Sequence, residues 1–165
     1  MFLKSTPLEI GTLVAQVESP ARGAVASFLG TVRNHQDGRN VLRLEYSAYA
    51  PMAEVECARI VAEAEDRWDC AVALVHRIGT LEVGDTAVAI AAASAHREEA
   101  FAACRYVIEE IKRRVPIWKR EFFGDGMVEW VGSGEAGERV SAEAPRQRGH
   151  EVTQQLIARS DRGDN

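Results

Sequence analysis

Pro116 is the residue that most constrains how this chain folds. Residues 94–115 carry apolar side chains at helical spacing, and residues 117–123 have the pattern of a strand. The proline ring cannot continue a helix, and it disfavours the helical conformation of Val115 before it. The sequence therefore predicts a long helix that passes directly into a strand. Basic residues flank this junction: Lys112, Arg113, Arg114, Lys119 and Arg120.

Two more helices are predicted nearer the N-terminus. Thr6, Pro7 and Glu9 have the spacing of a helix start with Thr6 as N-cap, and Pro51 is expected to open a second helix that runs to Trp68. Residues expected to face the core are Leu13 and Val17 in the first helix, Met52, Val55, Val61 and Ala64 in the second, and Phe101, Cys104, Val107, Ile108 and Ile111 in the third, which Ser94 is expected to cap.

Between the helices the chain has strand patterns. Strands are predicted over residues 23–32, 41–46, 71–78, 86–93, 117–123 and 127–131. The first is expected to be largely buried, and the second should place Leu42, Leu44 and Tyr46 on one face. Turn residues at 36–40 and 124–126 predict two hairpins, while residues 79–85 are expected to be a simple connection.

These elements indicate a mixed α/β fold of the α+β kind, with a mostly antiparallel sheet and packed helices. With 165 residues, 46% of them hydrophobic, the chain has the size and composition of about one globular domain. We expect that domain to cover residues 1–132. Residues 133–165 are polar, and we expect them to form a flexible tail.

Composition and charge exclude several classes of function. The net charge of -5 argues against general nucleic-acid binding. Cys57, Cys70 and Cys104 lack the spacing of a zinc site or a disulfide framework, so no metal or other cofactor is expected, and Cys57 and Cys104 are interpreted as packing residues. No membrane span or secretory leader is recognisable, which favours a cytoplasmic location.

Two segments are candidate anion sites. His96 and Arg97 lie where a strand passes into a helix, beside free backbone N–H groups; the alternative is that they are ordinary polar loop residues. Arg33 follows a predicted strand end, where its guanidinium could meet a phosphate, although one arginine alone is weak evidence.

Lys112 and Lys119 are the candidate catalytic residues. Strand alternation places Lys119 on the face of Ile117 and Glu121, opposite Trp118, and a lysine on an apolar-lined face suits proton transfer or attack on a carbonyl. The alternative is that the basic residues at 112–114 form a solvated helix end.

Motifs of phosphate loops, nucleophile elbows and metal-binding helices are absent from the sequence. Nearly all the candidate residues are cationic. They point to an anionic substrate and electrostatic stabilisation.

Four segments together resemble the molybdopterin synthase catalytic (large) subunit family. They are residues 23–35, 75–79, 94–97 and 111–121, and the resemblance extends from about Gly23 to Val131. It implies an α/β hammerhead fold and a homodimer, with a small ubiquitin-like subunit at each end of the dimer to give a heterotetramer. The implied reaction transfers sulfur, carried as a thiocarboxylate on the partner's C-terminal Gly-Gly, to cyclic pyranopterin monophosphate. Molybdopterin is the expected product.

The resemblance also implies roles for individual residues. The family's lysine pair falls on Lys119 and Lys112, and its substrate-binding residues fall on Arg33, His96, Arg97, Arg120, Glu121 and Phe28. Thr31 stands where relatives can carry a basic residue, which puts a substrate contact at that position in doubt.

Two other functions remain open from the residues alone. One is a non-enzymatic regulatory domain that senses a phosphorylated metabolite, which would need the anion site but not both lysines. The other is a phosphate-cleaving enzyme of the acylphosphatase type, suggested by Arg33 and Asn34 but lacking a glycine-rich cradle before the arginine.

Overall fold

The computed structural model describes residues 1–132 and 139–143. A mixed α/β architecture follows, as predicted, with the elements in this order: β1 (Leu3–Lys4), α1 (Ile10–Val17), β2 (Ala24–Thr31), β3 (His35–Gln36), β4 (Arg39–Ala48), α2 (Ala50–Trp68), β5 (Ala71–Arg77), β6 (Gly79–Glu82), β7 (Thr86–Ser94), α3 (Arg97–Arg114), β8 (Ile117–Phe123), β9 (Met127–Val131) and β10 (Arg139–Glu143). None of the helices in these residues is long and apolar enough to cross a membrane.

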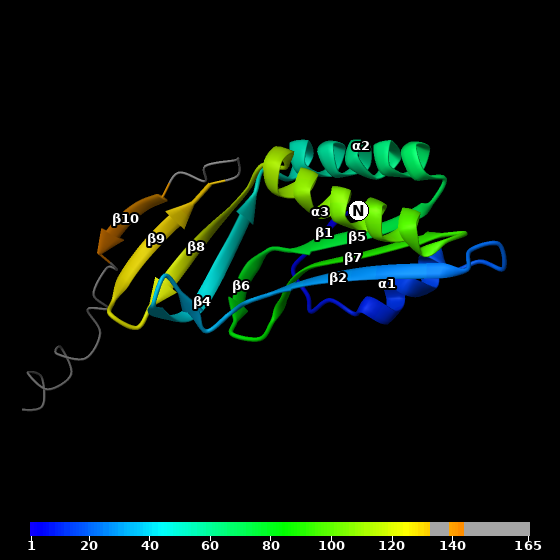
Figure 1. The fold of residues 1–165 in the computed structure, drawn as a ribbon. Helices are drawn as coiled ribbons and strands as arrows, with labels where there is room; N and C mark the ends of the chain where they lie inside the picture. Colours follow the sequence, from blue (N-terminus) through cyan, green and yellow to red (C-terminus); the bar gives the residue numbers. More distant parts are fainter. Residues whose placement is uncertain (133–138, 144–165) are drawn as a thin grey trace, which may run out of the picture.

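A four-stranded sheet with the order β1-β5-β7-β2 forms the half of the molecule that carries the helices (Figure 1). Only the β1–β5 pair is parallel among these strands. Helices α2 and α3 cover one face of this sheet, and α1 covers the other.

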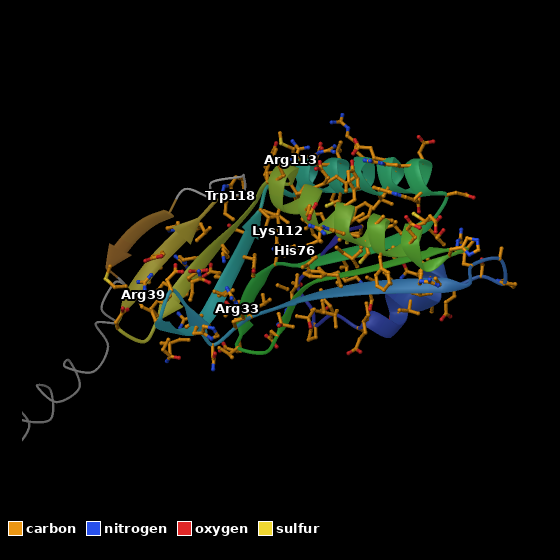
Figure 2. The ribbon with its side chains drawn as sticks, in the orientation of Figure 1. Arg33, Arg39, His76, Lys112, Arg113 and Trp118 are labelled. Carbon is orange, nitrogen blue, oxygen red and sulfur yellow. The ribbon has the colours of Figure 1, made fainter. Side chains whose placement is uncertain are left out.

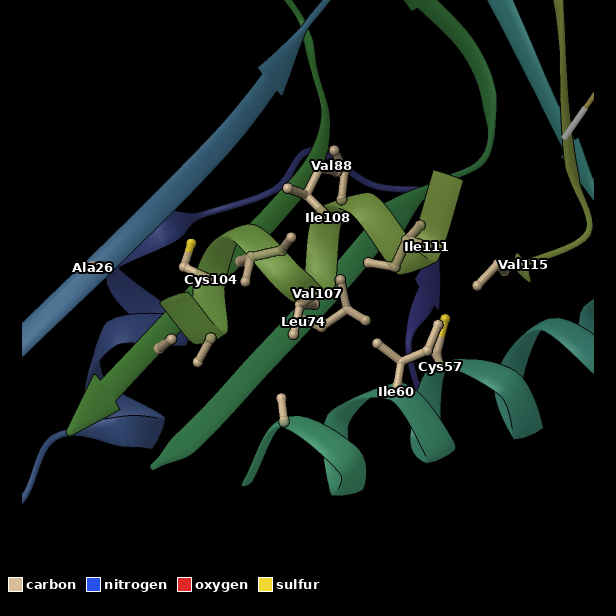
Figure 3. Packing of buried hydrophobic residues seen from close by; sticks show 14 of the residues in the cluster. Ala26, Cys57, Ile60, Leu74, Val88, Cys104, Val107, Ile108, Ile111 and Val115 are labelled. Carbon is tan, nitrogen blue, oxygen red and sulfur yellow. The ribbon is translucent and has the colours of Figure 1, made fainter. Parts of the chain in front are cut away.

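Strand β7 is sandwiched between these helical layers. All its residues except Thr86 are buried, and its alternate side chains join two different clusters. Val88, Ile90 and Ala92 pack toward α2 and α3, whereas Ala89, Ala91 and Ala93 pack toward α1. A continuous apolar run is what a strand buried on both faces requires. Figure 3 shows the larger cluster between the two long helices and the sheet.

A second sheet, with the order β10-β9-β8-β4-β3 and β6 paired to β4, extends beside the first (Figure 1). The β3–β4 hairpin turns through Asp37 and Gly38, both of which have positive φ. That conformation is typical of the tight turns that match strand twist. Leu81 on β6 is fully buried and anchors the small third cluster with Val41, Leu44 and Phe123.

The junction at Pro116 has the predicted geometry. Val115 is the extended C-cap of α3, and Ile117 begins β8. The last residue of α3, Arg114, forms ion pairs with Glu56 and Glu63 of α2 at 2.5 and 2.6 Å, and with Glu110 at 3.1 Å. These contacts tie the end of α3 to α2, so the direction in which β8 leaves the helix is well defined.

Both predicted helix caps are wrong. α1 begins at Ile10 with Glu9 as N-cap, not at Thr6, and no side chain caps it. Ser94 is the last residue of β7, and His96 is the N-cap of α3. The prediction at Thr6 relied on a local capping pattern. Residues Leu3 and Lys4, just before it, are instead held extended because β1 pairs with β5, and the helix begins later.

Helix faces were predicted with mixed success. Leu13 and Val17 of α1 are buried as expected. In α2, however, Met52 and Val55 are exposed, and in α3 Phe101 is exposed. The residues that pack in their place are Ala53, Cys57 and Ile60 of α2 and Ala100 and Ala103 of α3. Small side chains occupy much of the buried face of both helices, where they pack in one cluster with the sheet, so hydrophobicity alone misplaces the buried face.

Two strands differ from expectation in their burial. β2 was expected to be largely buried, but it is the edge strand of its sheet and only Ala26 is fully buried. In β4 the register against β8 shifts between Val41 and Arg43. This bulge reverses the alternation there, so Val41 enters the core while Leu42 is exposed.

Residues 79–82, predicted as part of a connection, form β6, and residues 139–143, predicted as part of a flexible tail, form β10 against β9. The rest of the tail prediction, for residues 133–138 and 144–165, lies outside the described residues.

Replacing Ile60 with alanine should lower the free energy of unfolding by about 2–5 kcal/mol, because the side chain is 0% exposed and its loss leaves a cavity between α2 and the sheet. Urea denaturation measures this change. Val55→Ala on the same helix is the control: Val55 is 51% exposed, so its truncation should cost less than about 0.5 kcal/mol. Equal losses from the two variants would contradict the packing described here.

Candidate active site

A cavity of about 630 Å³ lies where the two sheets meet the C-terminal end of α3. Side chains from β2, β4, β5, β7, α3 and β8 line it, so the site depends on segments from most of the chain. Its polar and charged lining residues are Thr31, Arg33, His35, Gln36, Tyr46, His76, Lys112, Lys119 and Glu121.

Lys119 faces this cavity from β8, together with Ile117 and Glu121, as strand alternation predicted. Its Nζ lies 2.6 Å from Oε1 of Glu121, whose side chain is only 2% exposed. The second oxygen of Glu121, Oε2, is buried and has no hydrogen-bond partner among the described residues. A buried carboxylate needs a counter-charge, so Glu121 holds the ammonium group of Lys119 at the cavity wall.

Lys112 differs from its basic neighbours at the end of α3. Arg113 pairs with Glu110 at 2.5 Å, and Arg114 pairs with three carboxylates. Lys112 lines the cavity and makes no ion pair with any residue that the structure describes. The solvated-helix-end interpretation therefore fits Arg113 and Arg114, whereas Lys112 is placed to meet an anion. Figure 2 shows Lys112 at the end of α3 that adjoins the second sheet.

Arg33 lies in the loop after β2 and also lines the cavity. Its Nη2 donates a hydrogen bond to Oε1 of Gln36 at 2.6 Å, and no carboxylate pairs with it in the described part of the chain. Three cationic side chains, Arg33, Lys112 and Lys119, thus share one cavity, and Glu121 is the only acidic residue among the described residues that line it. This balance favours a ligand with negative charge.

Tyr46 and His76 form a neutral part of the wall. Tyr46 is the register partner of Lys119 across the β4–β8 pair, and its ring meets the edge of the His76 ring at a centroid distance of 5.1 Å. Burial and the charge of Glu121 raise the pKa of Tyr46 to about 12. Burial lowers the pKa of His76 to about 4, although a hydrogen bond with the backbone of Arg77 opposes part of this effect.

A second ion pair lies behind Glu121. Glu129 of β9 is its register partner, so two buried carboxylates stand side by side across the strand pair. Glu129 forms an ion pair with Arg39, whose guanidinium also stacks 3.7 Å from the centre of the Phe123 ring. Each carboxylate therefore has its own cation, which limits the repulsion between them.

Three residues implied as substrate-binding lie away from the cavity within one chain. Arg120 points to the other face of β8, where it pairs with Glu45 and stacks on Phe122 and Trp130. His96 and Arg97 are exposed at the opposite end of α3 from Lys112, and the helical rise separates Arg97 from Lys112 by about 22 Å.

Sequence reasoning placed Phe28 near the pocket, and the structure has Phe28 and Thr31 among its lining residues. It missed Tyr46 and His76. A histidine at the end of an apolar strand was the signal that could have drawn attention to His76, because polar residues at strand ends often reach a cavity. Among the described residues, no cluster of His, Cys, Asp and Glu is suited to hold a metal ion.

Comparison with known proteins places this chain in a family. The family model described as MoaE protein matches residues 3–114. The chain belongs to the MoaE family. The molybdopterin synthase catalytic subunit of Bacillus subtilis strain 168 is 45% identical over 131 residues, which cover 79% of this chain and 83% of that protein. These matches confirm the family predicted from the sequence.

Solved structures agree. Molybdopterin synthase from Staphylococcus aureus superposes with a TM-score of 0.75 at 40% identity, covering 78% of this chain and 94% of that one. A complex of subunits 1 and 2 of molybdopterin-converting factor from Helicobacter pylori 26695 superposes with a TM-score of 0.56 at 22% identity, covering 79% of this chain and 76% of that one. The second likeness concerns the fold alone. The predicted fold class is confirmed.

The buried His76 should make stability depend on pH. Its pKa is lowered from 6.5 to about 4, so the unfolded chain takes up a proton that the folded chain refuses over this interval. The free energy of unfolding is therefore highest above pH 6.5, where His76 is neutral in both states. It falls by about 3 kcal/mol as the pH falls toward 4, because protonation of His76 favours the unfolded chain.

Urea unfolding of the wild type and of His76→Phe across this interval measures the effect. The wild type should lose stability relative to the variant, because phenylalanine has no proton to accept. Parallel pH profiles for the two proteins would contradict the burial of a neutral His76.

Proposed function

We propose that this MoaE-family chain is the catalytic subunit of a molybdopterin synthase. In this proposal it transfers sulfur from the thiocarboxylated C-terminus of a small ubiquitin-like subunit to cyclic pyranopterin monophosphate. The single observation that carries the proposal is the cavity in which Arg33, Lys112 and Lys119 converge. The proposal also includes the cytoplasmic location expected from the sequence.

Electrostatics explains why such a reaction needs this cavity. The thiocarboxylate and the phosphorylated substrate are both anions, so their approach is opposed until cations offset the repulsion. Arg33 and Lys112 have no acidic partner among the described residues, which leaves their charge available to a ligand. Lys119 is held beside Glu121 and so has a defined position before the substrate enters.

Distinct roles follow for the cations. Lys119, inside the cavity on β8, is assigned the activation of the substrate or the thiocarboxylate during sulfur transfer. Lys112, on the end of α3 that faces the same cavity, supports it. Arg33, in a loop at the cavity, is assigned to the phosphate, since a guanidinium fork matches phosphate oxygens.

Neither alternative function gains support. A metabolite-sensing domain and an acylphosphatase-type enzyme would each use Arg33, but neither explains why two lysines face the cavity. The relatives described above carry the name of an enzyme subunit.

Lys119→Ala should reduce molybdopterin formation by about 100-fold or more, because it removes the cation nearest the proposed reaction. The assay combines the variant with a thiocarboxylated small subunit and cyclic pyranopterin monophosphate. Lys4→Ala is the matched control, since Lys4 is exposed on β1 and does not line the cavity. Product formation by Lys119→Ala at the wild-type rate would refute the assignment.

The proposal includes two protein partners. Binding of a small subunit is supported by the Helicobacter pylori complex of two molybdopterin-converting-factor subunits, one chain of which has the same fold as this chain. A second copy of the chain is supported by β2, an edge strand that leaves Val25 and Leu29 exposed. Unpaired edges with apolar side chains favour pairing with another strand.

An antiparallel, two-fold pairing of β2 edges would complete the anion site. Ala24, at one end of β2, is the register partner of Ser94 and lies near His96 and Arg97 along the chain. Thr31, at the other end, lines the cavity. Two-fold pairing brings the Ala24 end of one copy beside the Thr31 end of its partner. We therefore assign His96 and Arg97 to the cavity of the second copy, where they join Arg33 on the phosphate.

Mixing two inactive variants tests this arrangement. Lys119→Ala and the double variant His96→Ala/Arg97→Ala should each be inactive, but their heterodimer should contain one intact cavity and recover about half of the wild-type activity. Differently tagged chains, co-expressed and purified as heterodimers, allow the measurement. An inactive heterodimer would show that each copy must supply all of its own residues.

A further inference from the structure

One part of the cavity lining, beside Lys119, carries no charge. Tyr46 and His76 supply its polar groups, and Phe28, Val88 and Ile108 supply apolar surface around them. The proposed function assigns the phosphate and the sulfur donor to the cations and leaves this wall unused. These uncharged polar and apolar groups suit the uncharged, planar part of a ligand.

The orientation of the His76 ring is set by the backbone. Nδ1 lies 2.8 Å from the carbonyl oxygen of Arg77, and because a carbonyl can only accept, Nδ1 carries the proton and donates. Nε2 is then an unprotonated acceptor. It has no hydrogen-bond partner among the described residues, although the His76 side chain is almost completely buried and lines the cavity.

Tyr46 complements this acceptor with a donor. Its ring packs edge to face with His76, and its hydroxyl keeps its proton because burial and Glu121 raise its pKa. No hydrogen bond from this hydroxyl is present in the described part of the chain, and Tyr46 lines the cavity, so the hydroxyl can donate to a ligand there. An acceptor and a donor without partners thus stand together on the neutral wall.

We propose that His76 Nε2 and the Tyr46 hydroxyl form a subsite for the edge of a fused nitrogen heterocycle, with His76 accepting a ring N–H and Tyr46 donating to a neighbouring ring oxygen or nitrogen. The subsite rests on the proposed function, in which the substrate carries a reduced pterin ring. Arg33 and the lysines hold the charged part of the same ligand. Both side chains are specificity-determining residues in this arrangement.

Binding of two separate probes tests the subsite. A phosphate-free reduced pterin and inorganic phosphate are titrated calorimetrically into the wild type, His76→Phe, His76→Gln and Tyr46→Phe. His76→Phe should weaken pterin binding by about tenfold and leave phosphate binding unchanged, since it removes one hydrogen-bond acceptor. Tyr46→Phe should act in the same way. His76→Gln should recover part of the affinity, because its amide oxygen can accept.

The outcomes separate this inference from the proposed function. If the wild type binds neither the pterin nor phosphate, the proposed function fails, and if it binds phosphate but not the pterin, the subsite is overturned. If the wild type binds it and His76→Phe binds it equally well, or if phosphate binding falls in parallel while thermal melting shows an intact fold, the subsite is overturned. Unchanged pterin binding with weaker binding of the small subunit would also overturn it.

Nitrogen NMR of the histidine rings gives a test that needs no ligand. The His76 signals, assigned by their absence in His76→Gln, should show a protonated Nδ1 and an unprotonated Nε2. A ring protonated at Nε2 instead would refute the subsite whatever the protein binds.

Discussion

The close packing of α3 on β2 and β7 decides where the functional side chains lie. Ala100, Ala103 and Val107 are fully buried on this helix, and Val88, Ile90 and Ala92 of β7 pack in the same cluster. Small side chains let helix and sheet approach closely, and a close-packed interface permits little sliding. The end of α3 is therefore held over the junction of the two sheets. Pro116 then forces the chain into β8, so Lys112 and Lys119 reach the same cavity from two different elements.

Ion pairing divides the basic residues of this region into those that stabilise the fold and those that remain available to a ligand. Arg114 and Arg113 are engaged by carboxylates of α2 and α3 and serve the structure, as does Arg39 with Glu129. Lys119 has one partner, Glu121, which is buried and cannot move far. Lys112 and Arg33 have none among the described residues. A chain of net negative charge thus creates a local positive site, because carboxylates engage Arg39, Arg113 and Arg114 while Lys112 and Arg33 are left for a ligand.

Local patterns predicted the elements better than they predicted burial. The helix–strand junction at Pro116, the start of α2 near Pro51, the turn at residues 36–40 and the β8–β9 hairpin were read correctly, because proline geometry and turn chemistry act over a few residues. The hairpin expected between residues 23–32 and 41–46 was wrong: β2 pairs with β7, and β4 turns back on the short strand β3. Leu42, Val55 and Phe101 were expected inside and lie outside. A bulge in β4 moves Leu42, and close helix packing prefers the neighbouring alanines and Cys57 to Val55 and Phe101. Neither effect is visible in one segment alone.

By itself, the sequence determined the family and the order of the three helices and the main strands, and it gave the hypothesis that Lys112 and Lys119 are catalytic, since these depend on residue identity and spacing along the chain. Only the tertiary structure decided which cations remain unpaired, that Arg120 faces away, and that His76 and Tyr46 belong to the cavity. It also showed that His96 and Arg97 are separated from Lys112 by the length of α3. The physical reason is that ion pairing, burial and distance arise between segments far apart in sequence, and these appear only when the sheets and helices have packed together.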